Sequence, residues 1–106
     1  MSDDVTILVD HTGREIRLND ERRDHILEHS EMADQFERIA ETVKTPETIV
    51  ATDADDTVHV YHRYYENTPV TSKFLLVVVK LLENDAFVLT AFFSKREKKG
   101  TTIWTA

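Results

Sequence analysis

The stretch Lys73–Leu82 constrains the fold more than any other part of the chain, because it is apolar almost throughout. Its uncharged run, Phe74–Val79, has the length of a strand and falls well short of the roughly 18 residues that a membrane-spanning helix needs. A run of this kind is typical of a central strand covered on both faces. Asn84 and Asp85 then favour a tight turn, and Ala86–Phe93 is expected to pair back as a second strand.

The residues between about 19 and 46 predict two helices. Asn19 or Asp20 can cap a helix over Glu21–His29, since a short side-chain oxygen accepts from the free amides of a first helical turn. Apolar residues recur at helical spacing within Met32–Val43, which predicts an amphipathic second helix. Pro46 ends it, because the residue before proline is pushed out of the helical region.

Short β-type segments flank these helices on both sides. With 106 residues, two glycines and two prolines, the chain is expected to form one domain, 1–106. Gly13 allows a turn between two N-terminal strands. The sequence predicts an α+β fold, with an N-terminal hairpin and two helices packed on a four- to five-stranded antiparallel meander sheet. The remaining predicted strands are Val5–Val9, Glu15–Leu18, Thr48–Ala51, Val58–Tyr65 and Thr101–Trp104.

Charge is distributed unevenly along the chain. Residues 1–56 carry 16 acidic and 6 basic side chains (a balance of −10), and residues 57–106 carry 4 and 7 (+3), which together give the net charge of −7. An acidic chain repels nucleic acid at long range, but a local basic field can still attract phosphate; the alternative interpretation is an acidic helical face that only keeps the protein soluble. The acidic start, Met1–Asp4, lacks the features of a signal peptide, and cysteine is absent from the sequence. We therefore expect a cytoplasmic protein that does not enter the membrane.

Familiar catalytic and cofactor motifs are missing from the sequence. Two glycines cannot build a dinucleotide fingerprint, and a chain without cysteine has no thiolate metal site. His25 and His29 lie four residues apart on one face of the first predicted helix. A zinc-protease helix would carry glutamate directly after the first histidine, where Ile26 stands. The pair fits proton transfer or ordinary polar positions at a helix edge, and we predict neither a metal nor a cofactor.

Lys80 and Thr90 are a second candidate pair. Lys80 interrupts the apolar run, so it either reaches solvent at the strand end or meets an anion. If the following hairpin pairs residues whose numbers sum to about 169, Thr90 comes close to Val79 and Lys80. The sequence then predicts a hydroxyl and an ammonium group side by side on the central strands.

Aromatic and cationic residues suggest where a nucleic acid would bind. Tyr61, Arg63 and Tyr65 alternate along one face of their strand, a pattern that fits base stacking and phosphate contacts or ordinary packing. The loop before the last strand adds a cluster of cations, which either guides phosphate or is simply solvated. These loop residues are Lys95, Arg96, Lys98 and Lys99.

The order of several segments resembles a known family. The segments, from about residue 20 to 104, are His25–Met32, Pro46–Ile49, Phe74–Lys80, Ala86–Phe92 and Thr102–Trp104. Together they resemble the phage-associated branch of the barnase, EndoU, colicin and RelE-like ribonuclease fold. The chain departs from the family pattern at Glu28, Ser30, Ala86 and Phe92, where arginine, proline, glycine and tyrosine are typical.

The resemblance implies helices packed on an antiparallel sheet, with the active site on the sheet's open face. It implies metal-independent cleavage of RNA, as a toxin or a processing nuclease, and assigns His25, His29, Lys80 and Thr90 to the catalytic site. A histidine would take the proton of the ribose 2′-hydroxyl, while Lys80, with Arg63 or Arg96, would stabilise charge on the phosphate.

Three kinds of partner follow from this interpretation. RNA is the expected substrate, and a neutralising protein would accompany a toxin. A homodimer could form through the edge of the first hairpin. The alternative function is a module of the same fold that binds RNA or a protein without catalysis.

Overall fold

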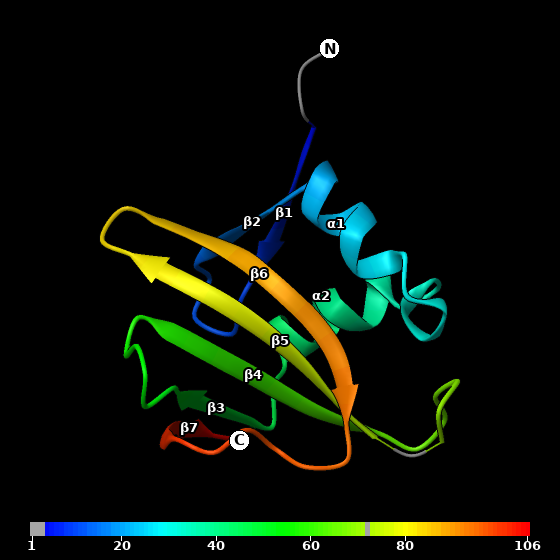
Figure 1. The fold of residues 1–106 in the computed structure, drawn as a ribbon. Helices are drawn as coiled ribbons and strands as arrows, with labels where there is room; N and C mark the ends of the chain where they lie inside the picture. The colour runs from blue at the N-terminus through cyan, green and yellow to red at the C-terminus, as the bar shows by residue number, and fades with distance from the viewer. Residues whose placement is uncertain (1–3, 72) are drawn as a thin grey trace.

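Helices cover one face of a sheet in the computed structural model, which describes residues 4–71 and 73–106 (Figure 1). Within these residues seven strands form one sheet in the order β1-β2-β6-β5-β4-β3-β7. The strands lie in front of α2 in the view of Figure 1. In chain order the elements are β1 (Val5–Val9), β2 (Glu15–Asn19), α1 (Asp20–Leu27), the 3-10 turn η1 (Ser30–Met32), α2 (Phe36–Lys44), β3 (Thr48–Ala51), β4 (Val58–Tyr65), β5 (Lys73–Leu82), β6 (Asp85–Ser94) and β7 (Thr101–Thr105).

The α+β class is confirmed, but the predicted purely antiparallel meander of four to five strands is wrong. Only β3, β4, β5 and β6 follow one another as a meander. The N-terminal hairpin extends the sheet, with β2 parallel to β6 through Arg17 and Phe87. β7 returns to pair with β3. Both additions cover strand edges whose backbone groups would otherwise lack partners.

The boundaries of both helices differ from the predicted ones. α1 ends at Leu27, so His29, the last residue of the predicted first helix, lies outside it with an extended backbone. Asn19 caps α1 as expected, its Oδ1 accepting from the Arg22 amide at 2.8 Å. The predicted second helix over Met32–Val43 is shorter, because α2 begins only at Phe36. The amide of Met32 bonds to the carbonyl of His29 at 2.8 Å, which closes a separate 3-10 turn.

The central hairpin is shifted from its predicted register. β5 is the middle strand of the sheet, as its apolar run predicts. The turn residues are Glu83 and Asn84 rather than Asn84 and Asp85. A bulge at Leu89 then moves the pairing, so that Thr90 lies opposite Val78. Such an inserted residue leaves no clear mark in an alternating pattern.

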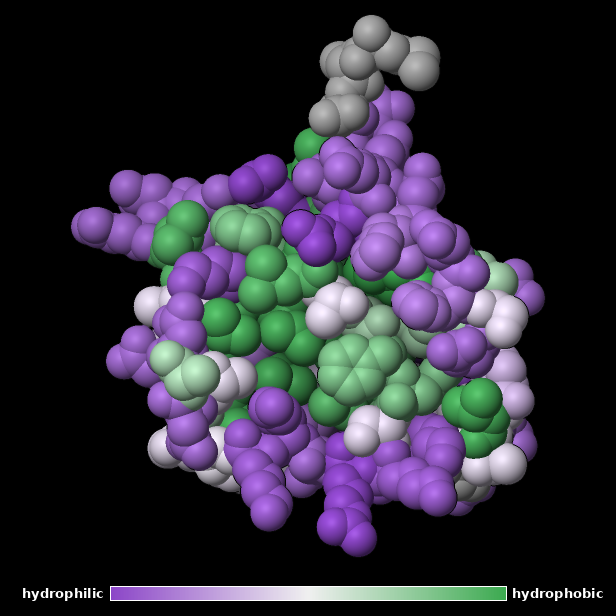
Figure 2. All heavy atoms as spheres, in the orientation of Figure 1, coloured by the Kyte–Doolittle hydropathy of each residue, from purple (hydrophilic) through white to green (hydrophobic). Residues whose placement is uncertain are grey.

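The core lies between the helices and one face of the sheet. Successive side chains on a strand point to opposite faces, so each strand buries alternate residues under the helices and presents the others on the open face. Figure 2 shows a hydrophobic centre on this open face, surrounded by hydrophilic side chains. None of the helices formed by the described residues could span a membrane. The largest core residues include Ile16, Leu18, Ile26, Met32, Ile39, Val43, Leu75, Val77 and Val79.

Candidate active site

His25 in α1 and His29, two residues after the end of α1, are exposed on the helix side of the sheet. The ring centroids of His25 and His29 are 6.4 Å apart, and both side chains are open to solvent. His25 lines a hollow of about 480 Å³ in which three carboxylates outnumber one arginine, so its charge opposes an incoming phosphate. The other residues of the hollow are Asn19, Glu21, Arg22, Asp24 and Glu28.

Lys80 and Thr90 lie on the opposite, open face. Their neighbours Val79 and Ala91 belong to the core under the helices, so strand alternation turns Lys80 and Thr90 the other way. The structure therefore does not bring the imidazoles of His25 and His29 and the Lys80 ammonium to a common hollow.

The Lys80 ammonium already has an anionic partner. Its Nζ lies 2.7 Å from Asp55 Oδ2 and donates to Thr57 Oγ1 at 2.6 Å. Hydrogen bonds from Lys80 and then from Thr57 hold the pKa of Asp55 well below its usual range. A phosphate at Lys80 would have to compete with this carboxylate.

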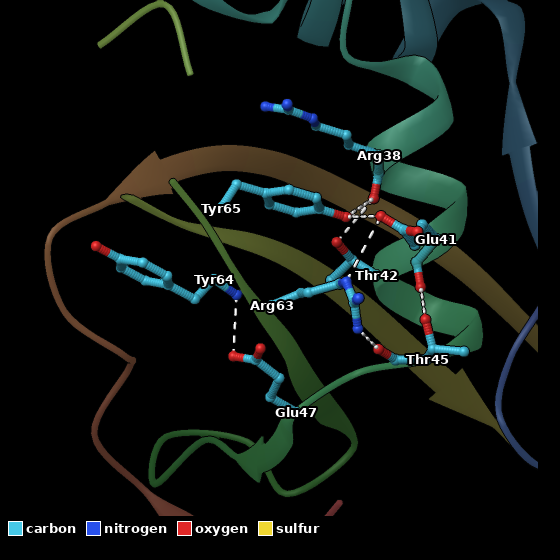
Figure 3. A network of polar contacts seen from close by, with 8 residues as sticks. All are labelled: Arg38, Glu41, Thr42, Thr45, Glu47, Arg63, Tyr64 and Tyr65. Carbon is cyan, nitrogen blue, oxygen red and sulfur yellow. Dashed lines mark hydrogen bonds and ion pairs between the residues drawn. The ribbon is translucent and has the colours of Figure 1, made fainter. Parts of the chain in front are cut away.

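The aromatic and cationic face of β4 packs against α2 (Figure 3). Tyr61 is only 2% exposed. Arg63 Nε lies 3.5 Å from Glu41 Oε1, and the Tyr65 hydroxyl donates to the same oxygen at 2.5 Å. Burial, followed by the Glu41 carboxylate, raises the pKa of Tyr65 to about 12. The Arg38 guanidinium covers the Tyr65 ring at 4.5 Å. Arg63 and Tyr65 thus connect β4 to α2 and Tyr61 is buried, so the three side chains do not form a free face for bases.

The basic loop between β6 and β7 is exposed on the open face. Lys95 and Arg96 are open to solvent, and Lys98 and Lys99 line a groove of about 540 Å³. The floor of this groove is part of the hydrophobic centre in Figure 2. Of the residues predicted to bind nucleic acid, Lys98 and Lys99 are the two that the structure brings together beside an apolar surface. The floor consists of Val60, Leu76, Val78 and Phe92.

The His62 side chain holds this basic loop through a hydrogen bond to the loop backbone. The ring is fully buried, and its Nε2 accepts the Lys98 amide at 2.9 Å. A neutral ring that accepts at Nε2 carries its proton on Nδ1, which lies 3.2 Å from Thr48 Oγ1. The Thr48 hydroxyl in turn donates to Glu97 at 2.6 Å. Burial lowers the pKa of His62, although the Glu97 charge acts against this, so the neutral form fits the observed bonds.

We expect the His62→Gln variant to reduce the loss of stability between pH 7 and pH 5. Because the pKa of His62 is lower in the folded state, the unfolded chain binds more protons as the pH falls. The contribution of His62 to stability is therefore complete above the ordinary histidine pKa of roughly 6.5 and declines below it. Glutamine can bond to Lys98 and Thr48 without titrating. Denaturant unfolding at three pH values measures the slope, and a variant that keeps the full wild-type slope would contradict this assignment.

A second pair of histidines, His11 and His59, lines one hollow at the β1–β2 turn, on the helix side. His11 and Arg14 come from this turn, His59 and Tyr61 from β4, and Trp104 from β7. They line a hollow of about 240 Å³, which we call the imidazole hollow. The His11 amide bonds to the carbonyl of Val43 at 3.0 Å and so ties the turn to the end of α2.

A buried carboxylate organises this hollow. Asp10 accepts from the Thr12 amide at 2.8 Å and hydroxyl at 2.6 Å, from the Arg14 amide at 3.0 Å, and from the Tyr61 hydroxyl at 2.9 Å. Burial alone would raise the pKa of Asp10, but these hydrogen bonds together lower it. Burial and the Asp10 charge raise the pKa of Tyr61, so that the phenol keeps its proton.

The two imidazoles of the hollow have different surroundings. Burial lowers the pKa of His59, against a hydrogen bond to the Asp56 backbone, and this favours a neutral ring at pH 7. The His11 ring packs on Trp104, with centroids 4.4 Å apart. Its Nδ1 is buried and has no hydrogen-bond partner among the described residues. One ring is thus suited to accept a proton, and the other holds an unused nitrogen.

Arg14 gives the hollow a positive charge. Its Nη2 donates to the carbonyls of Leu82 at 2.7 Å and Asp85 at 3.2 Å, which fixes the guanidinium. An arginine carries further N–H groups that remain for an anion. In residues 4–71 and 73–106, no three histidine, aspartate or glutamate side chains cluster as ligands for a metal ion. The hollow offers proton transfer and anion binding.

The α+β domain thus has a hollow lined by two imidazoles and an arginine, and the comparison with protein families assigns the domain to a nuclease-like class. The family model described as phage-Barnase-EndoU-ColicinE5/D-RelE like nuclease2 matches residues 2–105. The chain belongs to this family, as the order of its segments predicts. The chain matches no curated protein and no solved structure.

Sequence reasoning missed the imidazole hollow although its parts were visible. His59 and Tyr61 share one face of an alternating strand, and His11 lies in a turn beside Asp10. What was missing is the position of the first hairpin, which carries His11 to β4. The family resemblance instead implies a site at His25 and His29.

Proposed function

We propose that this domain is a metal-independent endoribonuclease whose proton transfers take place in the imidazole hollow. The observation that carries the proposal is that His11, His59 and Arg14 line the same hollow of a nuclease-family domain. Lys80 and Thr90 are separated from it by the sheet, and the hollow around His25 is acidic.

The proposed reaction is an internal transfer of the phosphate. Neutral His59 takes the proton of a ribose 2′-hydroxyl, and the oxygen attacks the adjacent phosphorus. The bond from phosphorus to the 5′-oxygen breaks, and this oxygen receives a proton from the imidazolium form of His11. Arg14 stabilises the additional negative charge on the phosphate as it forms. The products are a 2′,3′-cyclic phosphate and a free 5′-hydroxyl.

An end-group assay with labelled RNA in excess chelator tests the function. We expect cyclic phosphate ends from RNA and no cleavage of DNA of the same sequence, because DNA lacks the attacking hydroxyl. Cleavage that stops when the chelator is added would contradict a metal-independent reaction.

The second candidate is a binding module, favoured by the groove beside Lys98 and Lys99 on the open face. A module that only binds would retain RNA in a salt-dependent manner, since phosphate contacts release counterions. It would yield no cyclic phosphate. The same assay therefore separates the two functions.

A further inference from the structure

β1 forms one edge of the sheet and exposes three aliphatic side chains. Val5, Ile7 and Val9 are 43%, 46% and 44% exposed, whereas Leu8 between them is buried. The exposed residues lie on the open face, since Ile7 pairs with Arg17, which pairs with Phe87 opposite Lys80. The outer edge of β1 has no neighbouring strand in residues 4–71 and 73–106.

This edge lacks the usual protection against pairing. Proteins shield edge strands with charges, prolines or bulges, and Val5–Val9 contains none of these. Its five residues pair in regular register with β2. At the other edge, β7 shifts register against β3 between Ile49 and Val50, which interrupts a flat surface. β1 is therefore the edge open to another strand.

We propose that β1 pairs antiparallel with β1 of a second copy, across a twofold axis at Ile7. In this register Val5 of each copy lies opposite Val9 of the other, and the two Ile7 side chains meet. All six aliphatic side chains then share one face, where directly opposite pairs contact each other. The strand is self-complementary in this arrangement because its exposed positions are symmetric about Ile7. Pairing of β1 with itself also closes with two copies, whereas pairing of β1 with β7 of another copy leaves both edges free for further copies, in a ring or an open chain.

Charge makes this association depend on salt. Each copy carries a net charge of −7, and the register places Asp4 of one copy near Asp10 of the other. Added salt screens such repulsion, so it should strengthen the dimer. Binding of RNA would weaken under the same conditions. The proposal does not depend on the nuclease activity.

Single cysteines give the sharpest test, because the chain has none of its own. Residues directly opposite each other in an antiparallel pair are close enough for a disulfide after small adjustments. We expect the Ile7→Cys variant to form a disulfide-linked dimer under mild oxidation. The Leu82→Cys variant is the matched control, because Leu82 is equally exposed at 46% but lies at the tip of a hairpin.

The register is tested with a mixture of two variants. Val5→Cys mixed with Val9→Cys should crosslink much faster than either variant alone. Equal rates for the mixture and the separate variants would overturn the register, and an Ile7→Cys rate no higher than that of Leu82→Cys would overturn the dimer.

Sedimentation of the wild-type protein, which contains no cysteine, supplies the second measurement. The weight-average mass of the wild type should rise from 12.3 kDa towards twice this value between micromolar and millimolar concentration, and more readily at high salt. Ile7→Lys should remain monomeric, since it places two lysines opposite each other, while Leu82→Lys should associate like the wild type. A wild type that stays monomeric at millimolar concentration and high salt would overturn the proposal.

Discussion

Replacing His59 with alanine is expected to lower the rate of RNA cleavage by about 10²–10⁴-fold, the usual contribution of a general base. His59 is only partly buried, so its removal should leave the fold intact. His59→Gln should be equally inactive, since glutamine fills similar space but does not carry the proton. The loss should appear in kcat with little change in KM, because the imidazole acts on the reacting hydroxyl rather than on binding.

The His11→Ala variant should lower the cleavage rate by a similar factor, because the departing 5′-oxygen then receives no proton from His11. The double variant should be little worse than either single one, because both histidines act in one proton-transfer sequence. The His59→Ala variant should also lose the rise of the rate with pH that a general base produces. Unfolding curves and binding of a 2′-deoxy substrate serve as controls for structure and affinity.

His25 and His29 provide the decisive comparison. If His25→Ala and His29→Ala abolish cleavage while His59→Ala retains it, the site implied by the family resemblance carries the chemistry and the imidazole hollow does not. Full activity of both His59→Ala and His11→Ala would end our assignment of the hollow. The four variants have to be compared on the same RNA and at the same pH.

The strands of the meander could be predicted because their pattern is local. The bounds of β3, β4 and β5 follow from β-branched and aromatic runs between turn residues, and the structure confirms them. The place of the N-terminal hairpin could not be predicted in this way. Nothing within β2 specifies β6 as its neighbour, and their pairing depends on how the edges of the whole sheet are covered.

The candidate site shows the same division between local and tertiary information. Alternation alone separates Lys80 from Val79 on β5, but it does not say which face the helices cover. In the folded protein Val77, Val79 and Tyr61 belong to the core under the helices, and His59 lines the imidazole hollow together with residues of the β1–β2 turn. A sequence pattern of this length contains no signal for such contacts between distant segments.

Asp10→Ala is expected to lower the free energy of unfolding by about 2–4 kcal/mol, because it removes the acceptor of several hydrogen bonds at once. The Tyr61 hydroxyl would be left buried without its partner, and the turn that carries His11 would lose its bonds from Thr12 and Arg14. Activity should fall with stability, since this turn positions one imidazole. Tyr61→Phe should cost less, about 1 kcal/mol, because Asp10 keeps its other donors.

The pH dependence distinguishes the loss of this carboxylate from general damage to the core. The pKa of Asp10 is lower in the folded state than in the unfolded chain, so its stabilising effect is complete above the ordinary aspartate pKa of about 3.9 and disappears as the pH falls through the folded value. Denaturant unfolding should therefore show a constant difference between wild type and Asp10→Ala from pH 5 to 8, and a shrinking one below pH 4. A difference that persists undiminished in acid would mean that the variant perturbs packing rather than the hydrogen bonds of the carboxylate.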